Sequence, residues 1–535
     1  MIVKFISALV LTALLPMFST MPAVAEIESG LPPVTASRPD GLEIALADKP
    51  AAVKELYAQR HYMPLWFVNH DPSVAFQAAK KTILNAESEG LALSDYAQTL
   101  KTAEDHSQPW AIRELAMTTC VLSYLHDLIE GNLTRAEGKK WNGHGGINSL
   151  KGDYHQLFYA RMLADPTGSW LITYSNEDQI YQRLKEALSI QRALKEKSIW
   201  PDAILTKTLR KGMKNPEVRL LRQLLVRHGI GDPDIATPGD QDMYDDYVMS
   251  AVGVFQEKMG LKKDGLVGRR TREIINLSPA VRMMKIRIAM ERWRWLPPEL
   301  GAKHVMVNIP WFEMQLIDDH TIVDRMPVII GKPIRKTPVF STYIRGVRLN
   351  PAWNVPYSIA SKSKLRKLKK DPGCLAKSHF IVMNTKGEPI DPQTVNWEQV
   401  TRKTFTYRLR QAPGDYNALG RVRLLMHNPY AIFAHGTDVK SQRLFNYDNR
   451  SFSSGCMRMK DPLRVAEFLL DDQSKWSRSN LDAVIATDKT KEVALTGNVP
   501  IHVVYFTAWP QQDGSVQFRP DLYGMDAEIE KSLSA

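Results

Sequence analysis

Cysteine is scarce in this sequence, whose 535 residues include only Cys120, Cys374 and Cys456. An exported protein that relies on disulfides normally carries a dense and even set of cysteines, so three cysteines do not form a disulfide framework. A Cys120–Cys374 bridge stays open on the sequence alone. Cys120 lies in an apolar helical stretch where a small buried residue is expected. Cys456 follows Gly455 in a polar loop, and a role in packing does not explain it.

Long apolar runs are also missing beyond the first residues. The chain begins with Lys4, an apolar run from Phe5 to Phe18, and then Ala23-Val24-Ala25. This order is typical of a secretory signal peptide over residues 1–25, and the run is shorter than the roughly 20 residues that a membrane helix requires. We therefore expect export to a periplasm, with an uncleaved inner-membrane anchor as the alternative.

Acidic residues are outnumbered, 58 against 70 lysines and arginines, which gives a net charge of +12. Such a charge favours an anionic partner. Export argues against nucleic acid and leaves an anionic extracellular polymer or a membrane surface. A scattered excess of lysine that serves only solubility is the alternative.

Helical periodicity dominates the first half of the chain. Between residues 51 and 200 it comes without a cluster of catalytic side chains, so residues 26–205 are interpreted as a helical scaffold domain. Residues 206–277 predict a module of three helices, followed by a bridging helix over 278–302. The segment FQEKMGLKKDGLVGRRT in this module resembles the peptidoglycan-binding module.

Alternating apolar residues replace helical periodicity from residue 303 to the end and predict a β-rich domain. The expected fold class is therefore α+β, with several domains. A basic helix and loops interrupt the strand pattern over about 356–413, and six of the nine residues from Lys362 to Lys370 are cationic. A solvated helix face is the default explanation of this charge, and an insertion of this kind beside a site also suits a cap or a rim for an anionic substrate.

Cys456 has the neighbours that a nucleophilic thiol requires. A base or a positive potential increases the thiolate fraction of a cysteine. The candidate base is His435, at the end of the predicted strand PYAIFAH, along which Ala431, Phe433 and His435 share one face. Gly455 permits a sharp turn whose N–H groups point toward an oxyanion, and Ser453 and Ser454 complete that turn. Arg458 is predicted on the same strand face as Cys456, either to bind a substrate carboxylate or to hold the loop.

Other catalytic classes lack their motifs. The sequence has no HExxH, no CxxC pair and no second histidine near Cys456, which argues against a zinc site. It also lacks the G-x-S-x-G motif of the α/β-hydrolases. We expect no metal and no organic cofactor.

The pattern HGT, a loop and then RSFSSGCMR resembles the signature of the L,D-transpeptidase (YkuD-type) family. The segments VIIGKPIRKTPVFS, LNPAWNVPYSI, RQAPGDYNALGRV and VVYFTAWPQQDGSVQFRPDLYG resemble its large YcbB-like members. The resemblance implies Cys456 as nucleophile, His435 as base, and oxyanion or substrate contacts from Gly455, Ser454, Arg458 and Gly436. Many members have Ser-His-Gly-Cys where this chain has Ser454, so a secondary histidine contact is absent here.

The resemblance implies a peptidoglycan cross-linking enzyme. Cys456 would accept an acyl group from a tetrapeptide stem, release D-alanine and transfer the acyl group to the diaminopimelate amine of a second stem. Three alternatives stay open: hydrolysis by an L,D-carboxypeptidase, another acceptor such as a lipoprotein lysine or a free D-amino acid, and a noncatalytic wall-binding scaffold. The partners expected are peptidoglycan peptides and glycan, with other wall-synthesis proteins as further candidates. The oligomeric state is open.

Overall fold

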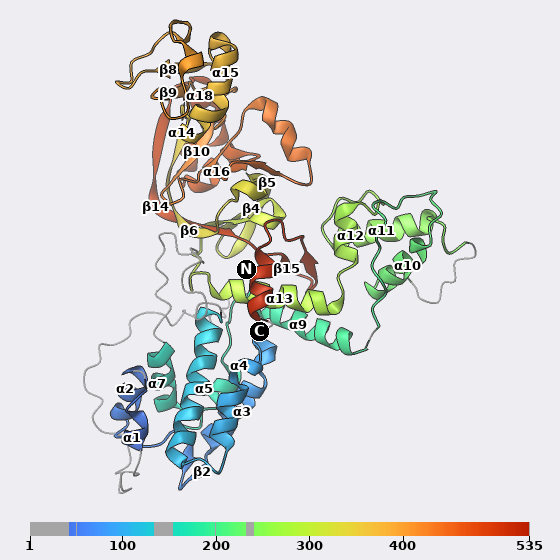
Figure 1. Ribbon diagram of the computed structural model, residues 1–535, viewed down its shortest axis with the longest axis vertical. Coiled ribbons are helices and arrows are strands. Elements are labelled where there is room, and N and C mark those ends of the chain that lie inside the picture. Colours follow the sequence, from blue (N-terminus) through green and yellow to red (C-terminus); the bar gives the residue numbers. More distant parts are fainter. Residues whose placement is uncertain (1–41, 50, 133–153, 198, 232–239, 534–535) are drawn as a thin grey trace, which may run out of the picture.

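The computed structural model describes residues 42–49, 51–132, 154–197, 199–231 and 240–533. Helical domains precede a sheet-rich domain (Figure 1), which confirms the α+β, multidomain prediction. The predicted signal peptide lies outside the described residues. Within the described part of the chain, no helix is long and apolar enough to cross a membrane.

The N-terminal domain packs around the long helix α5. Most of α5 is buried, and Cys120 on it is 1% exposed, as predicted for a core residue. The buried carboxylate of Glu114 accepts hydrogen bonds from Tyr57 Oη at 2.8 Å and from the Leu65 N–H at 2.6 Å, which fixes α5 against the preceding segment. The elements are α1 Leu42–Leu46, α2 Ala51–Gln59, β1 Phe67–Val68, β2 Asp71–Pro72, α3 Val74–Leu84, η1 Ala86–Glu89, α4 Ser94–Glu104, α5 Trp110–Glu130, α7 Tyr154–Ala164 and α8 Trp170–Thr173.

Helices α9 (Gln179–Lys197) and α13 (Pro279–Arg294) lie between this domain and the sheet-rich domain (Figure 1). Buried Arg294 on α13 joins several elements: it donates to Glu291 Oε2 at 2.9 Å, to Tyr181 Oη on α9 at 2.7 Å, and to the Glu89 carbonyl of η1. Such charge-assisted hydrogen bonds are stronger than neutral ones. They connect α13 to both the scaffold and α9.

The three-helix module comprises α10 (Glu217–Arg227), α11 (Asp246–Lys258) and α12 (Arg269–Ile275). Val248, Val252, Phe255 and Met259 are all buried and form the core-facing side of α11 and its C-terminal end. The Gln256 side chain holds the turn between α11 and α12: its amide donates to Asp264, Leu266 O and Thr271 and accepts from the Asp264 and Gly265 N–H groups.

The main sheet of the sheet-rich domain has nine strands in the order β12-β5-β13-β11-β10-β6-β14-β3-β4, and β4 also pairs with β5, so this sheet closes on itself. Alternate residues fill one apolar core, including Val347, Leu424, Ala434 and Met457. The strands are β3 His304–Asn308, β4 Glu313–Asp318, β5 Thr321–Gly331, β6 Phe340–Leu349, β10 Val422–Met426, β11 Ala434–His435, β12 Ser451–Ser453, β13 Met457–Met459 and β14 Lys491–Val504.

The remaining elements of this domain surround the sheet. Helices α16 and α18 contribute Val465, Leu469 and Leu481 to its apolar core, and α19 packs against α13. These surrounding elements are η2 Ile309–Trp311, η3 Pro333–Arg335, η9 Val439–Asn446, α16 Pro462–Leu469, α17 Gln473–Trp476, α18 Arg478–Ala486, β15 Ala508–Pro510, β16 Val516–Phe518 and α19 Met525–Leu533.

The segment predicted as a cap has its own three-stranded sheet, β7-β9-β8, and its own core around Leu368, Trp397 and Leu409. It forms the upper end of the molecule in Figure 1. Its elements are β7 Trp353–Asn354, α14 Tyr357–Ile359, η4 Ala360–Lys364, α15 Leu365–Lys370, η5 Pro372–Cys374, η6 Ala376–Ser378, β8 Phe380–Met383, η7 Pro392–Thr394, η8 Trp397–Gln399 and β9 Arg408–Gln411.

Candidate active site

Parallel pairing of β11 with β13 brings the two predicted reactive side chains onto one sheet face. Ala434 lies opposite Met457 and His435 opposite Arg458, and the Met457 N–H donates to the Phe433 carbonyl at 2.9 Å. Because side chains alternate along a strand, His435 and Arg458 share the face opposite the core residues Ala434 and Met457. Phe433 and Cys456 directly precede these two strands and continue the same alternation, and Cys456 also packs in part against the apolar core. The described residues contain no hydrogen bond between Cys456 Sγ and the imidazole.

The strand predicted over PYAIFAH is shorter than expected. Only Ala434–His435 is a strand, because Ala431 has a positive φ of 54°. The Asn428 side chain holds this turn through bonds of 2.8 Å to the Ile432 carbonyl and 3.1 Å from the Ile432 N–H. Phe433 and His435 keep the common face that the alternation predicted, and Ala431 does not.

The turn before Cys456 is held by side-chain hydroxyls. Gly455 has φ +119°, a backbone conformation that residues with a Cβ rarely adopt. Its N–H donates to Ser453 Oγ at 3.0 Å, and its carbonyl accepts from Thr337 Oγ1 at 2.7 Å. The Gly455 N–H therefore has a partner already, whereas among the described residues the Cys456 N–H has none.

The His435 imidazole is buried, 4% exposed, and a carbonyl orients it. Nδ1 lies 2.6 Å from the Gly436 carbonyl oxygen. A carbonyl only accepts, so Nδ1 carries the proton and Nε2 the lone pair. Burial, helped by the positive charge of Arg458, lowers the pKa of His435 to about 3. The ring is therefore neutral at pH 7 and able to accept a proton.

The Cys456 thiol is half-buried, and burial raises its pKa above the ordinary value of 9.0. A backbone hydrogen bond from Phe433 and the positive charges of Arg458 and Arg423 act in the opposite direction. The resting site consequently holds a neutral thiol beside a neutral imidazole. Reaction requires the proton to leave sulfur as the new bond forms.

The other predicted residues lie around this pair. Ser454 is exposed and accepts a hydrogen bond from Arg335 Nη1 at 2.9 Å. Half-buried Arg458 contacts Thr437 Oγ1 at 3.4 Å. Gly436 is buried, and a Cβ there would lie 3.3 Å from the Leu419 carbonyl oxygen.

Sequence reasoning missed three residues at this site. Thr337 bonds the nucleophile turn, Gly420 approaches Thr437 N so closely that a Cβ would lie 2.4 Å away, and Arg423 lies opposite His435 across β10 and β11. The available signals were the Thr in RKTPVF, the Gly in ALGRV, and the arginines that alternate with apolar residues in RVRLL. Contacts between segments far apart in the chain bring them to the site.

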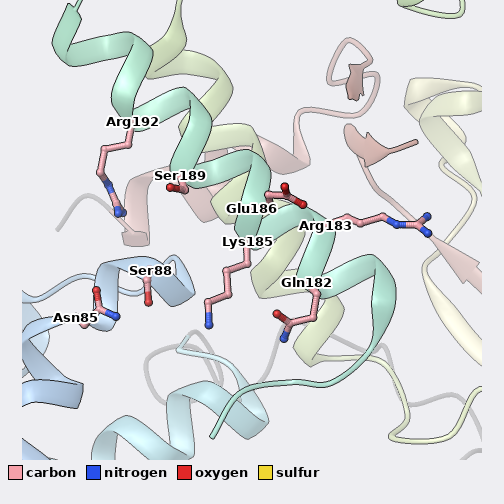
Figure 2. Close-up of a pocket in the computed structure, with 8 residues that line it drawn as sticks. All are labelled: Asn85, Ser88, Gln182, Arg183, Lys185, Glu186, Ser189 and Arg192. Carbon is pink, nitrogen blue, oxygen red and sulfur yellow. The ribbon is translucent and has the colours of Figure 1, made fainter. Parts of the chain in front are cut away.

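Other pockets of the described structure lie away from this site. A polar pocket of about 580 Å³ opens between η1 and α9 (Figure 2), lined by Asn85, Ser88, Gln182, Arg183, Lys185, Glu186, Ser189 and Arg192. It contains none of the predicted site residues. Over the part of the chain that is described, no three His, Cys, Asp or Glu side chains are grouped to hold a metal ion, and all three cysteines are free.

The family comparison agrees with this geometry. Residues 302–491, which include Cys456 and His435, match the family described as "L,D-transpeptidase catalytic domain" (YkuD). The chain carries an L,D-transpeptidase catalytic domain. In the same chain, residues 51–188 match a "Scaffold domain", and residues 214–275 match a "Putative peptidoglycan binding domain". Both resemblances found in the sequence are thus confirmed.

The chain also has a curated relative. A Haemophilus influenzae protein named "Putative L,D-transpeptidase" is 34% identical over 245 residues, which are 46% of this chain and 48% of that protein. The match thus spans about half the length of the relative.

Solved L,D-transpeptidases are more distant. The enzyme of Stackebrandtia nassauensis is 11% identical over 56% of this chain and 97% of its own, with a TM-score of 0.21. That of Xylanimonas cellulosilytica is 12% identical over 57% and 100%, with a TM-score of 0.16.

Proposed function

We propose that this protein is a peptidoglycan L,D-transpeptidase with Cys456 as nucleophile. The observation that carries the proposal is the β11–β13 register, which puts a thiol and a buried, carbonyl-oriented imidazole on one face of an L,D-transpeptidase domain. A nucleophile paired with an oriented base is the arrangement that acyl transfer through a covalent intermediate requires.

In the first step the sulfur of Cys456 attacks the carbonyl between the L-centre of diaminopimelate and the terminal D-alanine of a tetrapeptide stem. His435 takes the thiol proton and passes it to the departing nitrogen, so that the C–N bond breaks and D-alanine leaves. The Cys456 N–H, which has no other acceptor among the described residues, donates to the oxyanion. The product is a thioester on Cys456.

In the second step the side-chain amine of diaminopimelate from another stem attacks the thioester. The new amide bond forms as the C–S bond breaks, and the proton lost by the amine returns to sulfur through His435. The product is a cross-link between two diaminopimelate residues. By the same chemistry, the strained carbonyl of a carbapenem acylates Cys456.

The peptidoglycan-binding domain supports a wall-bound enzyme in the periplasm. A second binding module on the same chain raises the local concentration of stem peptides at the catalytic site. The net positive charge favours the same anionic polymer.

The test uses the purified protein, a disaccharide tetrapeptide and intact-protein mass spectrometry, with Cys456→Ala as the matched variant. We expect an acyl adduct on the wild-type protein, loss of D-alanine, and a diaminopimelate-linked dimer that the variant does not make. Tripeptide alone would identify an L,D-carboxypeptidase. An unmodified wild-type protein that still binds peptidoglycan would favour a noncatalytic scaffold.

A further inference from the structure

We infer that Arg423 is a substrate-binding residue that receives a carboxylate of the donor stem peptide beside Cys456. The inference rests on the proposed function and deepens it. Nothing in the Cys456 motif itself indicates Arg423, which lies 33 positions earlier on another strand.

The first argument is the row of charged side chains that crosses the sheet. Strand register pairs Glu492 with Arg348, Arg348 with Arg423, Arg423 with His435, and His435 with Arg458. Residues directly opposite on neighbouring strands project from the same face. The row therefore leads from β14 to the strand that follows Cys456.

The second argument is the lack of a hydrogen-bond or ion-pair partner for the Arg423 guanidinium. Glu492 pairs with Arg348, the neighbour of Arg423. Among the described residues, none accepts a hydrogen bond from Arg423 or pairs with it, and its buried Nε has no partner. Glu492 acts on Arg423 electrostatically but forms its ion pair with Arg348. The hydrogen-bonding capacity of the half-buried Arg423 guanidinium is therefore unused within the described residues, and it favours a ligand that brings an anion.

The third argument is position. The Arg423 guanidinium lies 3.8 Å from the centre of the Phe433 ring, and Phe433 is the residue opposite Cys456. Arg423 and Cys456 are also close enough to shift each other's pKa. One strand separates β10 from β13, so their backbones are about 10 Å apart, a gap that a short peptide can span.

A carboxylate fits this position because guanidinium groups bind carboxylates through paired, charge-assisted hydrogen bonds. A tetrapeptide stem offers two candidates. Its terminal D-alanine carboxylate is separated from the scissile carbonyl only by the leaving nitrogen and one α-carbon. The second is the carboxylate of the diaminopimelate side chain.

The experiment measures acylation rates of the full-length protein with three donors: the free tetrapeptide, its C-terminal carboxamide, and the tetrapeptide amidated on the diaminopimelate side chain. The variants are Arg423→Gln, Arg423→Lys, and Arg345→Gln as control. Arg345 is exposed on β6, three residues before Arg348. The readout is the ratio of kcat/KM between each amidated donor and the free donor, which a purely structural role of Arg423 would leave unchanged.

We expect the wild type and Arg345→Gln to prefer the free acid by about 10- to 100-fold, the size of a charge-assisted interaction. Arg423→Gln should reduce that preference to less than about 3-fold, and Arg423→Lys should keep part of it. The preference for the free acid that Arg423→Gln loses will be the preference over one of the two amidated donors. The carboxylate that is blocked in that donor is the one that Arg423 binds. Equal ratios in the wild type and Arg423→Gln would overturn the inference and leave the proposed function intact. No acylation of the wild type by any donor would overturn both.

Discussion

His435 lies directly opposite Arg458 in the parallel pairing of β11 with β13. The positive charge of Arg458 acts on both reactive groups: it lowers the pKa of the imidazole, and it lowers the pKa of the Cys456 thiol that burial raises. One arginine thus makes the thiol easier to deprotonate while keeping the base neutral. This balance has consequences that can be measured.

The pH dependence of thiol alkylation tests the resting protonation state. Because burial raises the pKa of Cys456 above 9.0, its reaction with iodoacetamide should still accelerate as the pH rises past 9. Arg458→Gln removes a charge that lowers this pKa, so the variant should react more slowly at pH 9. Peptide mass spectrometry resolves Cys456 from Cys374, which serves as the internal reference. A rate that is already constant below about pH 7 would indicate a preformed thiolate–imidazolium pair instead.

The conformation of Gly455 should be essential for the nucleophile turn. In Gly455→Ala the new Cβ would lie 2.9 Å from Ile432 Cδ1 at a φ of +119°. We expect a stability loss of about 1–3 kcal/mol and a drop in the acylation rate of about 100-fold, because the Cys456 N–H moves with the turn. Gly497→Ala, where a Cβ meets nothing within 4 Å, is the control. Comparable acylation by both variants would contradict this role.

The buried arginine of α13 should matter for stability. Arg294 is 2% exposed and Glu291 is 0% exposed, and removal of one partner from a buried ion pair typically costs about 3–5 kcal/mol. Arg294→Ala should lower the midpoint of urea unfolding followed by tryptophan fluorescence. Arg269→Ala, which removes the exposed Arg269–Glu273 pair, should cost less than about 0.5 kcal/mol. Similar midpoints for the two variants would contradict the expectation.

Gln256 should hold the peptidoglycan-binding domain together. Gln256→Leu leaves the N–H groups of Asp264 and Gly265 without their acceptor, and the unsatisfied buried donor of Gly265 costs about 1–3 kcal/mol. We expect faster hydrogen exchange in α11 and weaker sedimentation with insoluble peptidoglycan, while acylation by a soluble tetrapeptide is unchanged. Exposed Glu257→Gln is the adjacent control. Normal sedimentation of the Gln256→Leu variant would show that this network is dispensable for wall binding.

The sequence by itself determined a large part of this protein. Helical and alternating periodicity separated the α-rich half from the β-rich half, because each period reflects which side chains face a core. The motif around Cys456 indicated the candidate nucleophile, and the Asp264-Gly265 turn with Gln256 indicated the peptidoglycan-binding module. These features are local, so neighbouring residues carry them.

Only the tertiary structure decided what surrounds the thiol. Ala431 leaves the strand that alternation predicted, since the Asn428 side chain stabilises a turn there. Thr337, Gly420 and Arg423 join the site through contacts between segments far apart in the chain. Strand register depends on the whole closed sheet, because a shift of one residue would send every side chain of a strand to the opposite face. No local pattern in the sequence specifies that choice, and it is this choice that places Arg423 near Cys456.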